Sequence, residues 1–272
     1  MKVFISADME GVAGVADWDQ CRVGGAGYEL GCRLLLGEVN AAIDGAVAAG
    51  ATAVTVTDAH GLMANLAPDG LAGGASYRSG RNEPDYMMAG LDGSYDAVLF
   101  IGYHGSMPSP SVLSHTYNPR VVGDARIGGV RAGESGINAL AATGHGVPVA
   151  VITGDQYVGP EAEPFCPGIA SVGVKQSLGR ESAESLHPDA ARAAICNAVT
   201  AALADLGRLS APPVLGDLEV DVLTTDMAVL AARVRGVERT GERTVTIVTA
   251  DPLAAYRSFT AAIAITRGLS TS

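Results

Sequence analysis

Carboxylates and histidines follow three short apolar runs of the chain, at the point where each run ends. Asp8 and Glu10 follow the first run, His60 follows the second, and His104 follows the third. Carboxylate oxygens and imidazole nitrogens together suit zinc, manganese or iron, whereas calcium prefers a shell of oxygens. None of these candidates is a cysteine, and a mixed set of acids and histidines is typical of a catalytic zinc site. The sequence therefore predicts a catalytic metal centre, with zinc as the first choice.

Each of these side chains has an ordinary structural alternative when it is taken singly. Most Asp and Glu residues are exposed, and a lone histidine is more often a hydrogen-bonded polar residue than a ligand. A shared site is favoured because four side chains that can bind a metal all follow directly after one of the three apolar runs. Asp58 lies two residues before His60 and either orients that imidazole or is a turn carboxylate.

The sequence pattern does not assign a single role to the polar residues beyond the third run. His115 lies in the loop that follows this run. Glu134 lies between glycines at the start of a predicted helix, where the helix N-terminus favours negative charge, so it is either a ligand or a first-turn carboxylate. Asn138, one turn later, either contacts substrate or is a surface amide.

The elements that carry these residues alternate between strand and helix patterns. Apolar, β-branched runs predict buried strands, and apolar residues at helical spacing predict helices between them. Such alternation is typical of a parallel sheet with helices on both faces, a three-layer α/β sandwich whose ligands bind beyond the carboxyl ends of the strands. The predicted strands are Val3–Ala7, Ala53–Thr57, Asp96–Gly102, Val147–Thr153 and Ala170–Lys175, and the predicted helices are Glu29–Ala49, Ser135–Thr143 and His187–Gly207.

A composition break at Ser210–Pro213 predicts a linker. We therefore expect a catalytic α/β domain over residues 1–211 and a smaller α+β domain over residues 212–272. The smaller domain is expected to contain the strands Leu218–Leu223 and Thr244–Thr249 and the helices Asp226–Val234 and Pro252–Thr266.

The charge composition excludes some classes of partner. The 272 residues include 18 Lys and Arg against 29 Asp and Glu, which gives a net charge of −11. Nucleic-acid binding needs clustered positive charge, but the chain has two lysines and scattered arginines, so no nucleic-acid partner is expected. No apolar stretch is long enough for an export signal or a membrane span, and four dispersed cysteines fit a reduced, cytoplasmic protein without a membrane partner.

Six short motifs, in this order along the chain, resemble those of the zinc D-aminopeptidases of the dipeptide-transport type. The likeness spans nearly the whole chain, and an ordered series is far more specific than any single motif. Two departures are Gly105, where the family often has alanine, and the chain's own loop from Tyr117 to Arg131. The matching segments are Asp8–Gly14, Thr57–Asn65, Gly102–His104, Ser114–His115, Gly133–Ala139 and Val174–Gln176.

The resemblance implies a site with two zinc ions per subunit. Asp8 would bridge the two ions. Glu10 and His60 would complete one position, and His104 and Glu134 would complete the other. Of the two alternatives for Glu134, the resemblance therefore favours a metal ligand.

The resemblance also implies an activity and an assembly. His115 matches the family's catalytic histidine, and the expected activity is hydrolysis of short peptides that begin with D-amino acids such as D-alanine. We expect a metal-activated water as the nucleophile and His115 as the acid or base, although direct attack by His115 is chemically possible. A ring-shaped homo-oligomer is expected, with a decamer as its size. The alternatives are another metal-dependent amidase or esterase, or a non-catalytic peptide-binding protein of the same fold.

Overall fold

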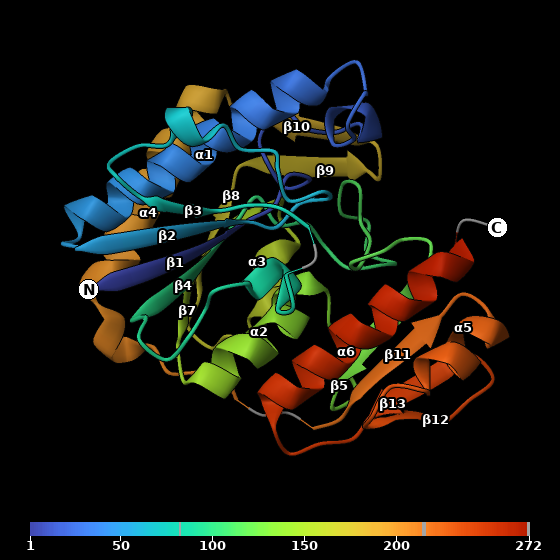
Figure 1. Ribbon diagram of the computed structural model, residues 1–272. Helices are drawn as coiled ribbons and strands as arrows, with labels where there is room; N and C mark the ends of the chain where they lie inside the picture. Colours follow the sequence, from blue (N-terminus) through green and yellow to red (C-terminus); the bar gives the residue numbers. More distant parts are fainter. Residues whose placement is uncertain (82, 214–215, 271–272) are drawn as a thin grey trace.

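A six-stranded parallel sheet forms the centre of the computed structural model, which describes residues 1–81, 83–213 and 216–270 (Figure 1). The strand order is β3-β2-β1-β4-β7-β8, and every neighbouring pair is parallel. This confirms the predicted α/β class. The strands are β1 (Lys2–Ala7), β2 (Ala53–Asp58), β3 (Ser76–Arg78), β4 (Ala97–Ile101), β7 (Val149–Gly154) and β8 (Ala170–Gly173).

The central strands are buried on both faces because alternate side chains enter two different apolar clusters. In β1, Val3 and Ile5 pack with α1 and α4, whereas Phe4 lies in the cluster that contains α2. Figure 1 shows α1 and α4 on one side of the sheet and α2 and α3 on the other. These helices are α1 (Tyr28–Ala48), α2 (Glu134–His145), α3 (Val158–Ala162) and α4 (Pro188–Ala204).

A second, antiparallel sheet lies beside the α2 face, in the strand order β12-β13-β11-β5-β6 (Figure 1). Helix α6 joins it to α2, and one apolar cluster continues from the parallel sheet through α2 into this second sheet. The elements are β5 (Val122–Ile127), β6 (Val130–Arg131), β11 (Leu218–Val222), α5 (Thr225–Ala231), β12 (Val237–Arg239), β13 (Thr244–Ile247) and α6 (Pro252–Thr266).

The expectation that residues 117–131 form a loop is wrong, because this segment contains β5 and β6. Strand β5 pairs with β11, so the second sheet takes strands from both sides of residue 211. The buried residues of β5, Val122, Ala125 and Ile127, do not alternate regularly, and its partner β11 is distant in the sequence, so periodicity alone does not identify this strand. The domain boundary at 211 stays a prediction, and residues 214–215 and 271–272 of the predicted smaller domain lie outside the described residues.

A hairpin of β9 (Lys175–Gly179) and β10 (Ser182–Ser185) follows the last parallel strand. It was not expected as a separate element, since the sequence predicted one strand through Lys175. The hairpin carries Lys175 back toward the loop after β1. Within the described ranges, no helix has the length and apolar character needed to cross a membrane.

Candidate metal centre

Three adjacent strands bring the candidate residues to one edge of the parallel sheet. The carboxyl ends of β2, β1 and β4 lie side by side, and hydrogen bonding continues one residue beyond the strands. Asp8 N donates to Ile101 O at 2.8 Å, and Ala59 N donates to Ala7 O at 2.8 Å. The loops that carry the acids and histidines therefore begin from a shared, ordered edge.

Two glycines allow the loops after β1 and β4 to touch. Gly102 has φ +73°, and a Cβ atom there would lie 2.1 Å from Asp8 O. A Cβ atom on Gly11 would lie 1.8 Å from Tyr103 O. Only glycine fits these two positions, because any other side chain would displace the main chain that carries Asp8 or His104.

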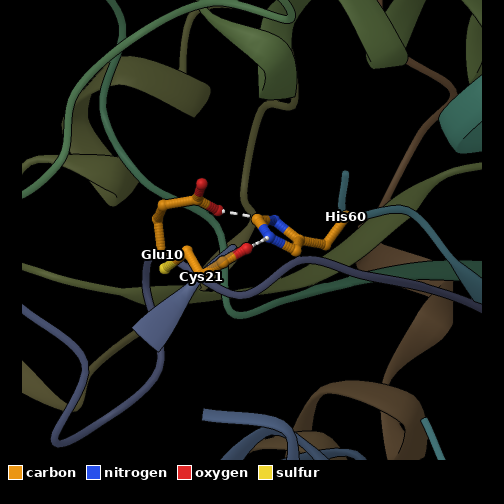
Figure 2. A group of neighbouring side chains, drawn as sticks. All are labelled: Glu10, Cys21 and His60. Atoms are coloured by element: carbon orange, nitrogen blue, oxygen red, sulfur yellow. Dashed lines mark hydrogen bonds and ion pairs between the residues drawn. The ribbon is translucent and has the colours of Figure 1, made fainter. Parts of the chain in front are cut away.

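Asp8 lies at the middle of the cluster, with one carboxylate oxygen toward each of two imidazoles. Its Oδ1 is 3.1 Å from His60 Nδ1, and its Oδ2 is 3.4 Å from His104 Nε2. Glu10 Oε2 lies 2.9 Å from His60 Nδ1 (Figure 2), and Glu134 Oε2 lies 3.5 Å from His104 Nε2. These distances connect all five predicted side chains, so the structure brings them together. All five are also buried.

The three histidines near this centre are held in one common way. Each donates one ring N–H to a main-chain carbonyl on its outer side. A carbonyl oxygen only accepts, so the other nitrogen of each ring faces the centre and presents a lone pair there when the ring is neutral, as in metal-binding histidines. The hydrogen bonds run from His60 Nε2 to Cys21 O at 2.7 Å (Figure 2), from His104 Nδ1 to Gly105 O at 2.9 Å, and from His115 Nδ1 to Leu113 O at 3.0 Å.

The electrostatics of the centre favour a cation. Burial, reinforced by Glu10 and Glu134, raises the pKa of Asp8 to about 7. Burial alone would lower the pKa of His104, but Glu134 and Asp8 outweigh it and raise that pKa to about 10. Both shifts arise because three buried carboxylates meet without a lysine or arginine ion pair among the described residues. A divalent ion would supply the positive charge that the protons otherwise provide.

The hydrogen-bonding pattern points the same way. Asp8 Oδ2, Glu10 Oε2 and His104 Nε2 are buried but make no hydrogen bond of acceptable geometry. Buried polar atoms almost always have a partner, so three such atoms around one point need an explanation. Mixed carboxylate and imidazole donors with inward lone pairs fit zinc.

His115 lies beside the centre, stacked on His104 with the ring centroids 4.2 Å apart. Its Nε2 is 3.7 Å from Glu134 Oε1, and its ring meets Trp18 edge to face at 5.5 Å. Burial, together with the charge of His104, lowers the pKa of His115. A neutral imidazole with a free inward nitrogen can accept a proton near neutral pH.

Two charged residues that support the centre were not predicted from the sequence. Lys175 is buried and donates to the carbonyls of Glu10, Val12 and Val15 in the loop after β1. Glu38 of α1 accepts from Ala13 N, in the same loop, at 2.8 Å. One signal was available, because Lys175 is one of only two lysines and lies in a matching motif.

Asp58 acts as a turn carboxylate. It accepts from Asn65 N at 2.6 Å and from Leu66 N at 3.0 Å, which closes the loop that carries His60. The imidazole itself is oriented by the carbonyl of Cys21, a residue that the sequence did not identify. The Cys21 thiol also lies near the centre, since Cys21, Glu10 and His60 donor atoms are all within 4.8 Å of one another.

Asn138 and Gly105 both lie in tightly packed surroundings near the centre. Asn138 is fully buried and donates to Tyr103 Oη at 2.8 Å, so the surface-amide alternative is wrong. A Cβ atom on Gly105 would lie 2.6 Å from Ser111 Cβ. Ser111 therefore occupies the space that an alanine methyl group would need at position 105.

A cavity of about 1080 Å³ opens onto the centre. Asp8, Glu10, His115 and Glu134 form its inner wall, and residues of α6 contribute to the wall on the side of the second sheet. An α/β fold with this donor set beside a large cavity is typical of the metal-dependent hydrolases.

Comparisons with known proteins define the family. A family profile described as D-aminopeptidase matches residues 1–261. The D-aminopeptidase of Bacillus subtilis (strain 168) is 32% identical over 269 residues, which cover 95% of this chain and 95% of that relative. The solved structure of a self-compartmentalizing protease, the Zn-dependent D-aminopeptidase DppA from Bacillus subtilis, aligns with a TM-score of 0.92 and 31% identity over 98% of both chains. The chain belongs to the D-aminopeptidase family, which confirms the resemblance seen in its motifs.

Proposed function

We propose that this chain is a zinc-dependent aminopeptidase that removes the N-terminal residue from short peptides, including peptides that begin with D-alanine. The observation that carries this proposal is the buried cluster in which carboxylates and inward-facing imidazole lone pairs surround one point. The similarity to a zinc-dependent D-aminopeptidase supports both the metal and the substrate class. The residues proposed to hold two zinc ions are Asp8, Glu10, His60, His104 and Glu134.

The chain's own residues have distinct parts in the proposed reaction. When bound, two zinc ions would supply Lewis acidity for the scissile carbonyl and lower the pKa of the attacking water. Asp8 has one oxygen toward each half of the centre, which suits a bridging carboxylate. Acidic side chains at the inner wall would also bind the free amino group of a peptide.

His115 is the proposed acid and base. Its Nε2 faces the centre, while Nδ1 is occupied by the carbonyl of Leu113. The ring can therefore accept a proton from water at Nε2 and return it to the leaving amine. Direct attack by His115 is a less favoured alternative, because zinc held by these residues would already supply an activated water.

The proposal extends to assembly and location. The similar structure is described as a self-compartmentalizing protease, which supports a homo-oligomer for this chain as well. A ring of ten subunits and a cytoplasmic location remain part of the proposal. Sedimentation of the purified protein tests the assembly, and a monomer at micromolar concentration would contradict it.

The activity is tested by metal analysis combined with hydrolysis assays. Purified protein is expected to bind two zinc ions per chain and to hydrolyse D-alanyl dipeptides, with activity lost on chelation and restored by zinc. Matched L-peptides, amides and esters separate the aminopeptidase from an amidase or esterase. Full activity after complete removal of metal, or no peptide hydrolysis by the zinc-loaded protein, would overturn the proposal.

Replacing a proposed ligand gives a second test. His104→Ala and Glu134→Ala should lower bound zinc and activity together, because ligand loss weakens the metal site. Unchanged zinc content in either variant would remove that residue from the ligand set.

A further inference from the structure

Positive charge is concentrated on the wall of the cavity that opens onto the centre. The whole chain carries a net charge of −11. Beyond the acids of the centre, however, the described residues that line the cavity include only two acids, Glu83 and Asp85. Asp85 is paired with an arginine at 2.8 Å. The lining arginines are Arg22, Arg81, Arg120, Arg257 and Arg267, of which Arg257 is the partner of Asp85.

Arg22 is the arginine that a chain of ring contacts connects to the reaction centre. Its guanidinium carbon lies 4.8 Å from the centroid of the Trp18 ring, within cation–π range. Trp18 in turn meets His115 edge to face, with their centroids 5.5 Å apart. Because both distances are measured from the Trp18 ring centroid, their sum is the upper limit of the distance between the Arg22 guanidinium carbon and the His115 ring centroid.

The loop that carries Trp18 and Arg22 is held by hydrogen bonds within its own segment. Asp17 and Gln20 form a capping box around the short helix η1 (Trp18–Gln20), and Gly25 N donates to Arg22 O at 2.9 Å. Trp18 and Arg22 are therefore presented from an ordered turn. Within the part of the chain that the structure describes, the Arg22 guanidinium has no carboxylate within 4.0 Å, so its charge is available to a ligand.

We propose that Trp18 and Arg22 form a subsite for the C-terminal carboxylate of a short peptide. This inference rests on the proposed function, since it assumes that the scissile carbonyl lies at the centre beside His115. An extended peptide advances about 3.3–3.6 Å per residue, so the terminal carboxylate of a dipeptide or tripeptide follows that carbonyl by one or two such steps. Such a carboxylate comes within reach of a guanidinium placed as Arg22 is.

The subsite sets substrate length and chemistry. The guanidinium binds a carboxylate through paired, charge-assisted N–H donors, while Trp18 holds the guanidinium plane. A C-terminal amide carries no charge and loses this interaction. The enzyme is therefore selective for dipeptides and tripeptides with a free carboxylate over the corresponding amides.

Steady-state kinetics with matched peptides test the subsite. The zinc-loaded enzyme should hydrolyse a D-alanyl tripeptide with a kcat/KM about 10- to 100-fold above that of its C-terminal amide. Arg22→Met should lower kcat/KM for the acid by a similar factor, mainly through KM, and should leave the amide unchanged. Arg22→Lys, which keeps the charge but not the paired donors, should fall between the two.

Arg33→Met is the matched control, because Arg33 is exposed on α1 and does not line the cavity. Equal hydrolysis of acid and amide by the wild type would overturn the subsite. So would an equal loss on both peptides in Arg22→Met, or an unchanged preference in that variant.

A binding measurement separates failure of the subsite from failure of the proposed function. Trp18 is the only tryptophan of the chain, so its fluorescence reports on this position alone. In metal-free protein, the tripeptide acid should change the emission at a concentration at least about tenfold lower than the amide, and Arg22→Met should abolish the difference. Equal titrations would overturn the subsite, whereas absence of hydrolysis with this difference intact would overturn only the peptidase proposal.

Discussion

The two loops that carry the proposed ligands Glu10 and His60 are stabilised in opposite ways. The loop after β1 is held by a cation, since Lys175 donates to three main-chain carbonyls. The loop after β2 is held by an anion, since Asp58 accepts from the main-chain N–H groups of Asn65 and Leu66. In both loops, buried polar or charged side chains satisfy main-chain groups that no secondary structure satisfies, and Glu38 also accepts from Ala13 N in the β1 loop.

The difference between the loops lies in the distance along the sequence. Asp58 is seven residues from Asn65, so the β2 loop is organised by its own segment. Lys175 is 165 residues from Glu10, so the β1 loop gains this cation only when the hairpin after β8 has folded. The main chain of the β2 loop is therefore closed locally, whereas that of the β1 loop depends on a distant hairpin. Substitutions in the two loops should therefore differ in their effect on the free energy of unfolding.

Lys175→Met should have the largest effect. It leaves three carbonyls and the buried Glu38 without their cation, which should lower the free energy of unfolding of the metal-free protein by roughly 3–5 kcal/mol. Zinc binding should weaken as Glu10 loses its position. Urea unfolding and zinc titration measure both effects, and Lys2→Met, which removes the only other lysine at an exposed site, is the control. Equal free energies of unfolding and equal zinc affinities in the two variants would show that Lys175 does not stabilise the β1 loop.

Asp58→Ala should have a smaller effect, because the loop it closes is short and local. Two buried main-chain donors lose their acceptor, which should lower the free energy of unfolding by about 2–3 kcal/mol. The variant should still bind zinc, but more weakly, as His60 becomes less ordered. Asp69→Ala, at an exposed position on the same connection, is the matched control. A larger loss in Asp58→Ala than in Lys175→Met would reverse the proposed order.

Glu38 adds a pH dependence to the β1 loop alone. Burial raises the pKa of Glu38 from 4.5 to about 7. The native state therefore binds more protons than the unfolded state between these pH values, so this group's contribution is fully present below pH 4.5 and is lost as the pH rises toward 7. The free energy of unfolding of Glu38→Gln, minus that of the wild type, should rise by about 1–3 kcal/mol over this window.

Chemical unfolding of the metal-free proteins at several pH values measures this slope. Glutamine keeps an oxygen that can accept from Ala13 N, so the loop should remain folded. A difference that stays flat or falls with rising pH would show that Glu38 is ionised in the native protein throughout the window.

His115→Ala should change stability and bound zinc least, since His115 supports neither loop. Turnover should nevertheless fall by roughly 10²- to 10⁴-fold, because the proposed acid and base is lost. Zinc analysis beside single-turnover kinetics separates these effects. Loss of zinc in proportion to activity would instead make His115 a ligand.

The sequence predicted much of the frame on which this contrast depends. The central strands and α1 were predicted to within two residues at each end, and α6 was predicted with its observed bounds. These elements have strong apolar periodicity, which reflects burial directly. Strand β5 was missed because its stability comes from pairing with β11, and a partner that is distant in the sequence leaves no local pattern.

The amino-acid sequence was enough to identify the residues that could do chemistry and to place them after the strands of a parallel sheet, because residue types and the alternation of strand and helix patterns can be read along the chain. The folded structure was needed to show that Cys21 orients His60, that Lys175 holds the loop of Glu10, and that Trp18 contacts both His115 and Arg22. These contacts join segments with no common periodicity. Hydrogen bonds and ring contacts depend on distances of a few ångströms, and such distances exist only after the chain has folded.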